Sequence, residues 1–293
     1  MKKIFFILAV LFIVVGVQAQ DTKQIAGNLT DYAKQDTARG WKHSGISSLT
    51  FGQTSLHNWI AGGNNTVSGD FVFNASLNYV NDKFFWDNNL SLEYGLVYSS
   101  STDWMKAADK LNLTSIAGRK ISKIWSVSVL LNFYTQFAKG YNYPDKSHYI
   151  SNLMAPGYLD AALGVSYKPN KNYSLFVSPV SERAIFVLDD SLSNKSAFGV
   201  KSGKKTKFET GAYLLASTNQ TLSNNLNLIS TVDLFTPYTQ DFGNIDINWN
   251  VLLSYKINKF FTTTLNTTLR YYDKEIKKIQ FKEILGFGLT YKF

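Results

Sequence analysis

Apolar and polar positions alternate along most of this chain, and the alternation is strictest at its end. In the closing stretch FKEILGFGLTYKF, every odd position from Leu285 to Phe293 is apolar, and the even positions between them are small or polar. The same pattern fills residues 245–257, where Ile, Trp, Val, Leu and Tyr alternate mainly with Asp, Asn, Ser and Lys. A period of two places apolar side chains on one face of an extended strand and polar side chains on the other. The sequence therefore predicts strands with one apolar and one polar face.

About twelve such strands are predicted. The seventh contains Pro179, which cannot donate a backbone hydrogen bond, so we expect a bulge or an early end there. The predicted strands cover residues 45–53, 67–79, 84–98, 111–117, 125–137, 159–167, a stretch beginning at 173, 207–217, 226–235, 245–257, 261–271 and 281–293.

The connections between these strands alternate in length. Those after the even-numbered strands are short or modest, and those after the odd-numbered strands are mostly longer, including residues 139–156 and 189–206. Outer-membrane barrels combine short periplasmic turns, long outer loops and usually an even number of strands. The polar face consists of Asn, Ser, Thr, Asp and Lys throughout, and such side chains are too polar to form the core of a soluble β-sandwich. The predicted fold class is all-β, a transmembrane antiparallel up-and-down β-barrel of about twelve strands.

The N-terminus has the pattern of an export signal. Two lysines precede the apolar run at residues 4–17, and Val17-Gln18-Ala19 offers small residues for cleavage before Gln20. A run of this length is typical of a signal peptide and too short to span a bilayer as a helix. We expect a signal peptide at 1–19, a periplasmic lead-in segment at 20–43 and the barrel domain at 44–293.

The amino-acid composition of the chain limits the catalytic and binding chemistry that it can carry out. The chain has no Cys, which excludes disulfides, thiol catalysis and Cys-ligated metals. Its three His have no paired spacing, so neither a metal site nor another cofactor is predicted. The formal net charge of +9 is spread along the chain, which suits anionic lipid headgroups or anionic solutes and argues against nucleic acid as a partner. Aromatic residues make up 15%, as the aromatic girdles of a barrel require.

Six charged residues are predicted to face the lumen near the outer mouth, on neighbouring strands eight to twelve. Opposite charges on adjacent strands can pair in a narrow lumen. One interpretation is a charged constriction that selects or gates solutes. The other is an ion-paired plug that stiffens the wall. The six candidates are Lys207, Glu209, Asp233, Asp246, Arg270 and Lys282.

Two other features bear on possible functions. Ser55 and His57 are two residues apart, so a strand would place both on one face, as a lipid-hydrolysing serine enzyme needs. The spacing is common and a loop is equally compatible with it, so we predict no enzyme. The loop at 139–156 is rich in Tyr and could stack on sugars, bind a partner protein or pack against the rim.

Several stretches together resemble a family of Gram-negative outer-membrane barrels of unknown function. They are SLHNWIAGGNN at 55–65, QFAKGYNYP at 136–144, residues 155–170, residues 244–261 and the closing QFKEILGFGLTYKF. The resemblance covers about residues 40–293. It implies an outer-membrane location, with outer-membrane lipids and the barrel assembly machinery as partners, and it assigns no activity. The ending also resembles the C-terminal strand of such barrels, which makes Tyr291 and Phe293 the expected assembly signal.

The expected function follows from the strand number. Eight strands enclose only side chains and sixteen leave an open channel, so twelve allow a narrow pore. We expect a narrow passive channel or small-solute transporter in the outer membrane. The alternatives are an envelope structural or partner-binding barrel without transport and, third, a lipid-modifying enzyme.

Overall fold

The computed structural model describes residues 39–57, 64–170, 172–238, 243–258 and 261–292 of the 293-residue chain. Fourteen strands and two short helices lie in these residues. The signal peptide predicted at 1–19 and most of the lead-in lie outside the described residues. The strands are β1 (Gly40–Thr54), β2 (Thr66–Val80), β3 (Phe84–Ser99), β4 (Asp103–Lys120), β5 (Trp125–Thr135), β6 (Gly140–Tyr141), β7 (Tyr149–Ser151), β8 (Gly157–Asn170), β9 (Tyr173–Phe186), β10 (Thr206–Ser223), β11 (Leu226–Pro237), β12 (Asp246–Lys256), β13 (Phe261–Tyr272) and β14 (Ile276–Lys292). The helices are α3 (Asp190–Asn194) and the 3-10 helix η1 (Ala197–Gly199).

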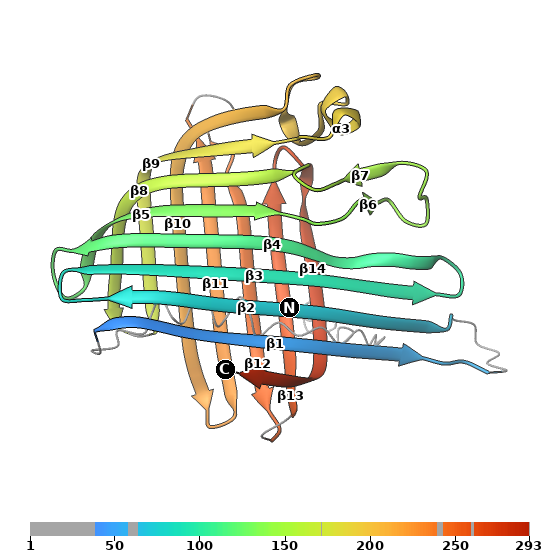
Figure 1. Ribbon diagram of the computed structural model, residues 1–293, viewed down its shortest axis with the longest axis horizontal. Helices are drawn as coiled ribbons and strands as arrows, with labels where there is room; N and C mark the ends of the chain where they lie inside the picture. Colours follow the sequence, from blue (N-terminus) through green and yellow to red (C-terminus); the bar gives the residue numbers. More distant parts are fainter. Residues whose placement is uncertain (1–38, 58–63, 171, 239–242, 259–260, 293) are drawn as a thin grey trace, which may run out of the picture.

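Twelve of these strands form one closed antiparallel barrel, as predicted. Each strand pairs with its neighbours in the wall, and β1 closes the barrel against β14 through Ile46–Leu49 and Leu289–Lys292. Strands β6 and β7 form a separate two-stranded sheet. In Figure 1, β1 to β5 run across the picture and β10 to β14 cross behind them at a steep angle. The predicted fold class is confirmed.

The connections distinguish two ends of the barrel. The "turn end" carries the connections at 81–83, 121–124, 171–172, 224–225 and 257–260, and the "loop end" carries those at 55–65, 136–156, 187–205 and 238–245. Two expectations need correction. The β3–β4 and β13–β14 connections at the loop end are only three residues long, at 100–102 and 273–275, because β4 begins at Asp103 rather than Leu111 and β14 at Ile276 rather than Phe281. The barrel also begins at Gly40, so the lead-in does not extend to residue 43.

The outer surface of the wall is apolar and exposed. On β5, Trp125, Val127, Val129 and Leu131 are 43–47% exposed, whereas Ser126, Ser128 and Leu130 between them are at most 9% exposed. Aromatic rings gather near the turn end, where Trp41 lies 5.3 Å from Tyr79 and 5.8 Å from Trp86. At the loop end, Tyr98 lies 5.4 Å from Trp104. An apolar band flanked by aromatic residues is the surface that a bilayer requires.

Helices contribute little to this chain. No helix in the described part of the sequence is long and apolar enough to span a bilayer.

The inner face is not polar throughout, and this corrects the sequence analysis. Seven inward side chains form an apolar cluster, and Leu130 at its centre is fully buried. Strand β5 contributes an apolar residue at an inward position where Ser126 and Ser128 precede it, so period-two alternation alone did not reveal the change. We call these residues the apolar cluster: Phe85, Ile116, Leu130, Ala162, Phe176, Tyr213 and Phe235.

A bulge in β9 sits at the predicted proline. Ser178 and Ser181 are buried, while Pro179 and Val180 between them are both exposed. The registers of β9 with β8 and with β10 shift at this point. A glycine on each neighbouring strand lies at these register shifts. A Cβ on Gly164 would collide with the Val177 carbonyl of β9, and one on Gly211 with the Thr236 carbonyl of β11. The prediction at Pro179 is confirmed.

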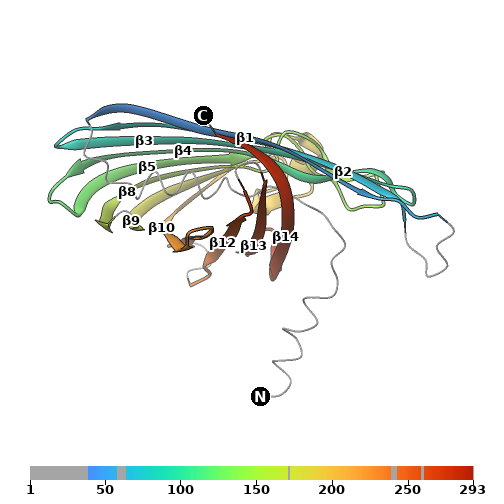
Figure 2. The same cartoon turned by 90° about the horizontal axis from the view of Figure 1, so that it is seen from below.

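The connections at the loop end pack on one another and on the wall. Figure 2 shows the barrel from below, with β12, β13 and β14 beneath the layer formed by β1, β3, β4 and β5. Leu192 and Val200 from the β9–β10 connection pack with Tyr158 and Ile185 of the wall. Gly199 approaches the side chain of Lys274, in the β13–β14 connection, so this segment reaches across the mouth. We call the packed connections at 136–156 and 187–205 the cap.

Asp189 joins the two parts of the cap. Its carboxylate accepts hydrogen bonds from Asn152 Nδ2 at 2.9 Å, Tyr149 Oη at 3.1 Å and the Leu192 N–H at 3.1 Å. Desolvation acts to raise the pKa of Asp189, but these hydrogen bonds outweigh it and lower the pKa below its ordinary value of 3.8. The tyrosines of this loop therefore pack against the rim, which was one of the alternatives.

Candidate functional site

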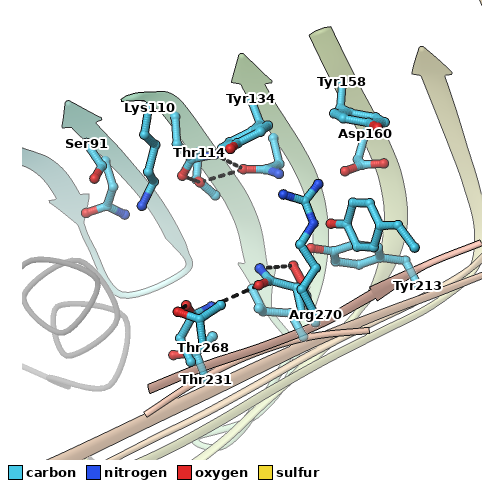
Figure 3. Close-up of a pocket in the computed structure, with 18 of the residues that line it drawn as sticks. Ser91, Lys110, Thr114, Tyr134, Tyr158, Asp160, Tyr213, Thr231, Thr268 and Arg270 are labelled. Atoms are coloured by element: carbon cyan, nitrogen blue, oxygen red, sulfur yellow. Dashed lines mark hydrogen bonds between the residues drawn. The ribbon is translucent and has the colours of Figure 1, made fainter. Parts of the chain in front are cut away.

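A cavity of about 240 Å³ lies inside the lumen, between the two walls of the barrel (Figure 3). Nine strands, from β3 to β13 without β6 and β7, line it, and most of the lining side chains are polar. In Figure 3, Ser91, Thr114, Tyr134 and Asp160 approach from one wall, while Thr231, Thr268 and Arg270 approach from the other. The lining residues are Asn89, Ser91, Glu93, Lys110, Asn112, Thr114, Asn132, Tyr134, Tyr158, Asp160, Arg183, Tyr213, Leu215, Thr231, Asp233, Asn248, Asn250, Thr268, Arg270 and Tyr272.

Arg183 is at the centre of the charged groups on the loop-end side of this cavity. Its Nε donates to Asp160 Oδ1 at 2.6 Å and its Nη1 to Asp246 Oδ2 at 2.9 Å. The guanidinium also lies 4.1 Å from the centre of the Phe235 ring, in the apolar cluster. The side chains of Arg183 and Asp160 are only 5% and 6% exposed. Arg183 therefore joins β8, β9 and β12 across the lumen by a buried ion-pair triad.

Arg270 makes a second, separate arrangement. Its Nη2 donates to Glu275 Oε1 at 2.6 Å, and the same carboxylate oxygen accepts from Tyr158 Oη at 3.0 Å. The guanidinium lies 4.0 Å from the centre of the Tyr272 ring. Both arginines are thus paired with carboxylates and stacked on aromatic rings, which is the usual way that a protein stabilises a buried guanidinium. The "charged layer" is defined as Asp160, Arg183, Lys207, Glu209, Asp246, Arg270 and Glu275.

The structure places five of the six predicted lumen residues. Asp233 and Arg270 line the cavity. Asp246 is paired with Arg183, which lines the cavity. Lys207 and Glu209 pair with each other at 2.6 Å, near the loop end of β10. The side chains of Lys282 and Tyr291, and the whole of Phe293, lie outside the described residues. The lumen-facing position of Lys282 and the assembly signal at Tyr291 and Phe293 therefore stay predictions. The functional role of all these residues stays a prediction.

Sequence reasoning missed Arg183, Asp160 as its partner, and Glu275. Continuing the alternation from Ser174, Phe176 and Ser178 would point Glu182 inward and Arg183 to the lipid. The bulge at Pro179 adds one residue and reverses that assignment, so Arg183 points inward. Glu182 instead accepts a hydrogen bond from Thr210 Oγ1 at 2.6 Å. Pro179 together with the glycines opposite it was the signal that could have revealed this change.

Neutral polar ladders line the two walls of the cavity below the charged layer. On β4 and β5, Asn132 Oδ1 accepts from Asn112 Nδ2 and from Thr114 Oγ1, both at 2.8 Å. On β12 and β13, Asn250 Oδ1 accepts from Thr268 Oγ1 at 2.9 Å. Asn250 Nδ2 donates in turn to Asn248 Oδ1 at 3.2 Å. The cavity therefore presents rows of amides and hydroxyls rather than a run of like charges.

The apolar cluster borders the cavity. On β3, β4, β5 and β8, its members come closer to the turn end than the cavity residues of the same strand. On β11, Phe235 instead lies closer to the loop end than Thr231 and Asp233 and contacts Arg183 of the charged layer. The cavity is thus a chamber in the lumen that both the apolar cluster and the charged layer border.

The alternative catalytic pair is not assembled in the described residues. Ser55 and His57 are exposed in the β1–β2 connection, and no hydrogen bond joins them there. Asn65, in the same connection, accepts a hydrogen bond from the Leu56 N–H at 2.6 Å through its Oδ1. Among the described residues, no group of three or more His, Asp or Glu could hold a metal ion.

A closed antiparallel barrel with an apolar outer surface, aromatic residues at both ends and a polar chamber inside is an outer-membrane β-barrel. Residues 51–141 of the chain match the model of a family described as a protein of unknown function, DUF3078. This match confirms the predicted resemblance to an uncharacterised family. No curated protein matches the sequence.

Solved structures of bacterial outer-membrane proteins are similar in outline. An outer-membrane channel of Pseudomonas putida F1 has a TM-score of 0.39 at 10% identity, covering 88% of this chain and 95% of that chain. The translocator domain of the autotransporter NalP from Neisseria meningitidis has a TM-score of 0.41 at 10% identity, with 92% and 95% covered. A FadL homologue of Pseudomonas aeruginosa has a TM-score of 0.31 at 11% identity, with 80% and 72% covered. Similarities at this level assign no activity to the chain.

Proposed function

We propose that the protein is a narrow channel for small solutes in the outer membrane of a Gram-negative bacterium, reached through a signal peptide at 1–19. Outer-membrane lipids and the barrel assembly machinery are its proposed partners. The observation that carries the proposal is the polar chamber in the lumen. A barrel that serves only as a scaffold has no need of an internal space lined by twenty residues from nine strands.

The proposed resting state is closed, and side chains rather than backbone close it. The Arg183 triad and the apolar cluster, which meet at Phe235, both bring side chains together across the lumen beside the chamber. Such contacts can separate without breaking the backbone pairing of the wall. Opening then requires the cap to move from the mouth and the triad to exchange its partners.

Single-channel conductance in a planar bilayer tests this proposal. The refolded protein is expected to show small, infrequent openings, and Asp246→Asn to open more often, because Arg183 then has one carboxylate partner instead of two. Asp103→Asn is the matched control, since Asp103 pairs with Lys146 on the exposed rim. A folded barrel that stays silent in the wild type and in Asp246→Asn would overturn the proposal.

The second candidate is a structural barrel that does not transport. It is favoured by the same apolar cluster, which fills part of the lumen with packed side chains as in small closed barrels. The conductance experiment separates the two candidates directly. A lipid-modifying activity has no comparable observation in its favour.

A further inference from the structure

Four hydrogen-bonding groups of chamber-lining residues are buried and have no partner among the described residues. Three are neutral: the Asn89 Nδ2 group and the hydroxyls of Ser91 and Thr231, whose residues are 3%, 3% and 7% exposed. The fourth is the Nε group of Arg270, whose Nη2 already donates to Glu275. A buried donor without a partner costs about 1–3 kcal/mol, so native structures rarely leave several of them in one place. Their grouping around one cavity indicates a ligand that supplies the missing partners.

The charges of the chamber do not select an ion. Three lining residues are cationic, Lys110, Arg183 and Arg270, and three are anionic, Glu93, Asp160 and Asp233, so the lining balances at 3 − 3 = 0. Both guanidiniums are already paired with carboxylates, so an anion would compete with Asp160 and Glu275 for them. A neutral ligand meets no net formal charge here, whereas a charged ligand meets lining groups of its own sign as well as of the opposite sign.

The remaining surface suits a polyhydroxylated molecule. Amides and hydroxyls both donate and accept hydrogen bonds, and a sugar hydroxyl does the same. The rings of Tyr134, Tyr158, Tyr213 and Tyr272 lie beside these groups and offer apolar faces to the C–H faces of a sugar ring. The volume of about 240 Å³ is below the roughly 300–1,000 Å³ of pockets for drug-sized ligands, so the ligand is small.

From this geometry we infer that the chamber binds a neutral sugar of monosaccharide size. The polar ladders and the unpartnered groups of Asn89, Ser91 and Thr231 hold its hydroxyls, and the tyrosines lie along its ring. This inference rests on the proposed function in that it names the class of solute that the channel takes. It is tested by binding, which does not require the channel to open.

The probe is D-glucose, and its binding to the folded barrel in detergent is measured by saturation-transfer NMR and equilibrium dialysis. Gluconate and glucosamine, which have similar size but carry a negative and a positive charge, are measured in parallel. Glucose is expected to bind, and the two charged probes to bind at least several-fold more weakly. Equal binding of glucose and gluconate, or no binding of glucose, would overturn the inference.

Thr231→Val is the decisive variant. It replaces a buried, unpartnered hydroxyl by a methyl group of the same shape, so the barrel is expected to fold at least as well as the wild type. Loss of one hydrogen bond to the sugar is expected to weaken glucose binding about two- to tenfold. Ser166→Ala is the control, because Ser166 faces the lumen outside the chamber and donates to Ser128 at 2.8 Å. Unchanged binding in Thr231→Val would contradict the assignment.

Liposome swelling in the same sugars separates the two proposals. Binding without flux would leave the sugar site standing and refute the channel. Flux of glucose and gluconate at equal rates, without measurable binding, would leave the channel standing and refute the sugar site.

Discussion

Strand β5 shows how differently the two faces of this wall are built. Its outward residues, Trp125, Val127, Val129 and Leu131, are all apolar and equally exposed. Its inward residues change from serine to the buried Leu130 and then to Asn132 in the chamber. The outward face repeats because lipid imposes one requirement at every position. The inward face varies because, along β5, the lumen contains an apolar cluster at one height and a polar chamber at another. The outward side chains therefore indicate where the protein resides, and the inward side chains bear on its function.

An insertion in β9 that exchanges its inward and outward faces is expected to have the largest effect on folding. One alanine inserted between Ser181 and Glu182 would turn Glu182 into the lumen and Arg183 toward lipid. The change places a charge on the lipid face and leaves Asp160 and Asp246 without their cation, so it is expected to abolish the folded barrel. Heat-modifiable migration on electrophoresis measures this outcome.

Deletion of Val180 is the control for the insertion. It removes the extra residue of the bulge and keeps Ser181 and Arg183 on the inward face, so a folded barrel is expected. If the insertion folds as well as the deletion, the bulge does not determine which side Arg183 faces.

Breaking the buried triad is expected to have the next largest effect. Arg183→Ala leaves two carboxylates buried without a partner and should cost about 3–5 kcal/mol of unfolding free energy, as measured for other buried ion pairs. Urea titration of the barrel in lipid vesicles gives this value. Arg183→Leu combined with Asp160→Asn and Asp246→Asn should recover most of the loss, and failure of that rescue would indicate a role beyond charge compensation.

A charge on each face compares the two surfaces directly. Leu131→Arg places a cation in the middle of the lipid-facing band and is expected to cost about 2–4 kcal/mol. Asn250→Arg faces the chamber near Asp233 and should cost far less. The same urea titration measures both variants, and equal costs would mean that the facing of β5 or β12 is wrong.

The cap gives the smallest expected effect. Asp189 is the N-cap of α3, and Asp189→Ala should cost about 0.5–2 kcal/mol of local stability, seen as faster hydrogen exchange at residues 190–205. The neighbouring Asp190→Ala should have less effect, because its side chain is 90% exposed.

The pKa of Asp189 also predicts the pH dependence of the cap. Since this pKa is lower in the folded protein, the contribution is present above pH 3.8 and is lost as the pH falls through the folded value. The protection factors of the amides at 190–205, which are corrected for the intrinsic pH dependence of hydrogen exchange, should therefore fall in acid. Protection factors that do not change with pH would show that the Asp189 carboxylate does not hold the cap.

Much of the wall could be predicted from sequence because lipid enforces a period of two. The twelve strands and the facing of Asp246 follow from that rule, whereas the irregularity at Pro179 follows from the missing N–H of proline. The length of β4 did not follow, since residues 103–110 carry Lys and Asp and lack the alternating pattern. Arg183 was missed because a single extra residue reverses the alternation after it.

The contents of the lumen were also beyond a local pattern. Leu130, Ile116 and Phe235 come from strands far apart in sequence, and only the closed barrel brings them together. The same holds for Glu275, which reaches Arg270 and Tyr158 from a short connection.

The closure of the barrel has a kinetic consequence. Ile46 of β1 pairs with Lys292 of β14, 246 positions later. In every other pair of the barrel, the two strands follow one another along the chain with no other barrel strand between them. Hairpins between neighbours close short loops and form early, but this seam must wait for nearly the whole chain. Residues 289–292 are therefore the last part of the wall to be translated and the part that completes it. A chain that pauses before this step exposes the unpaired edges of β1 and of the last strand formed. The pairing of β14 with β1 therefore sets how long these edges can pair with the wrong strand.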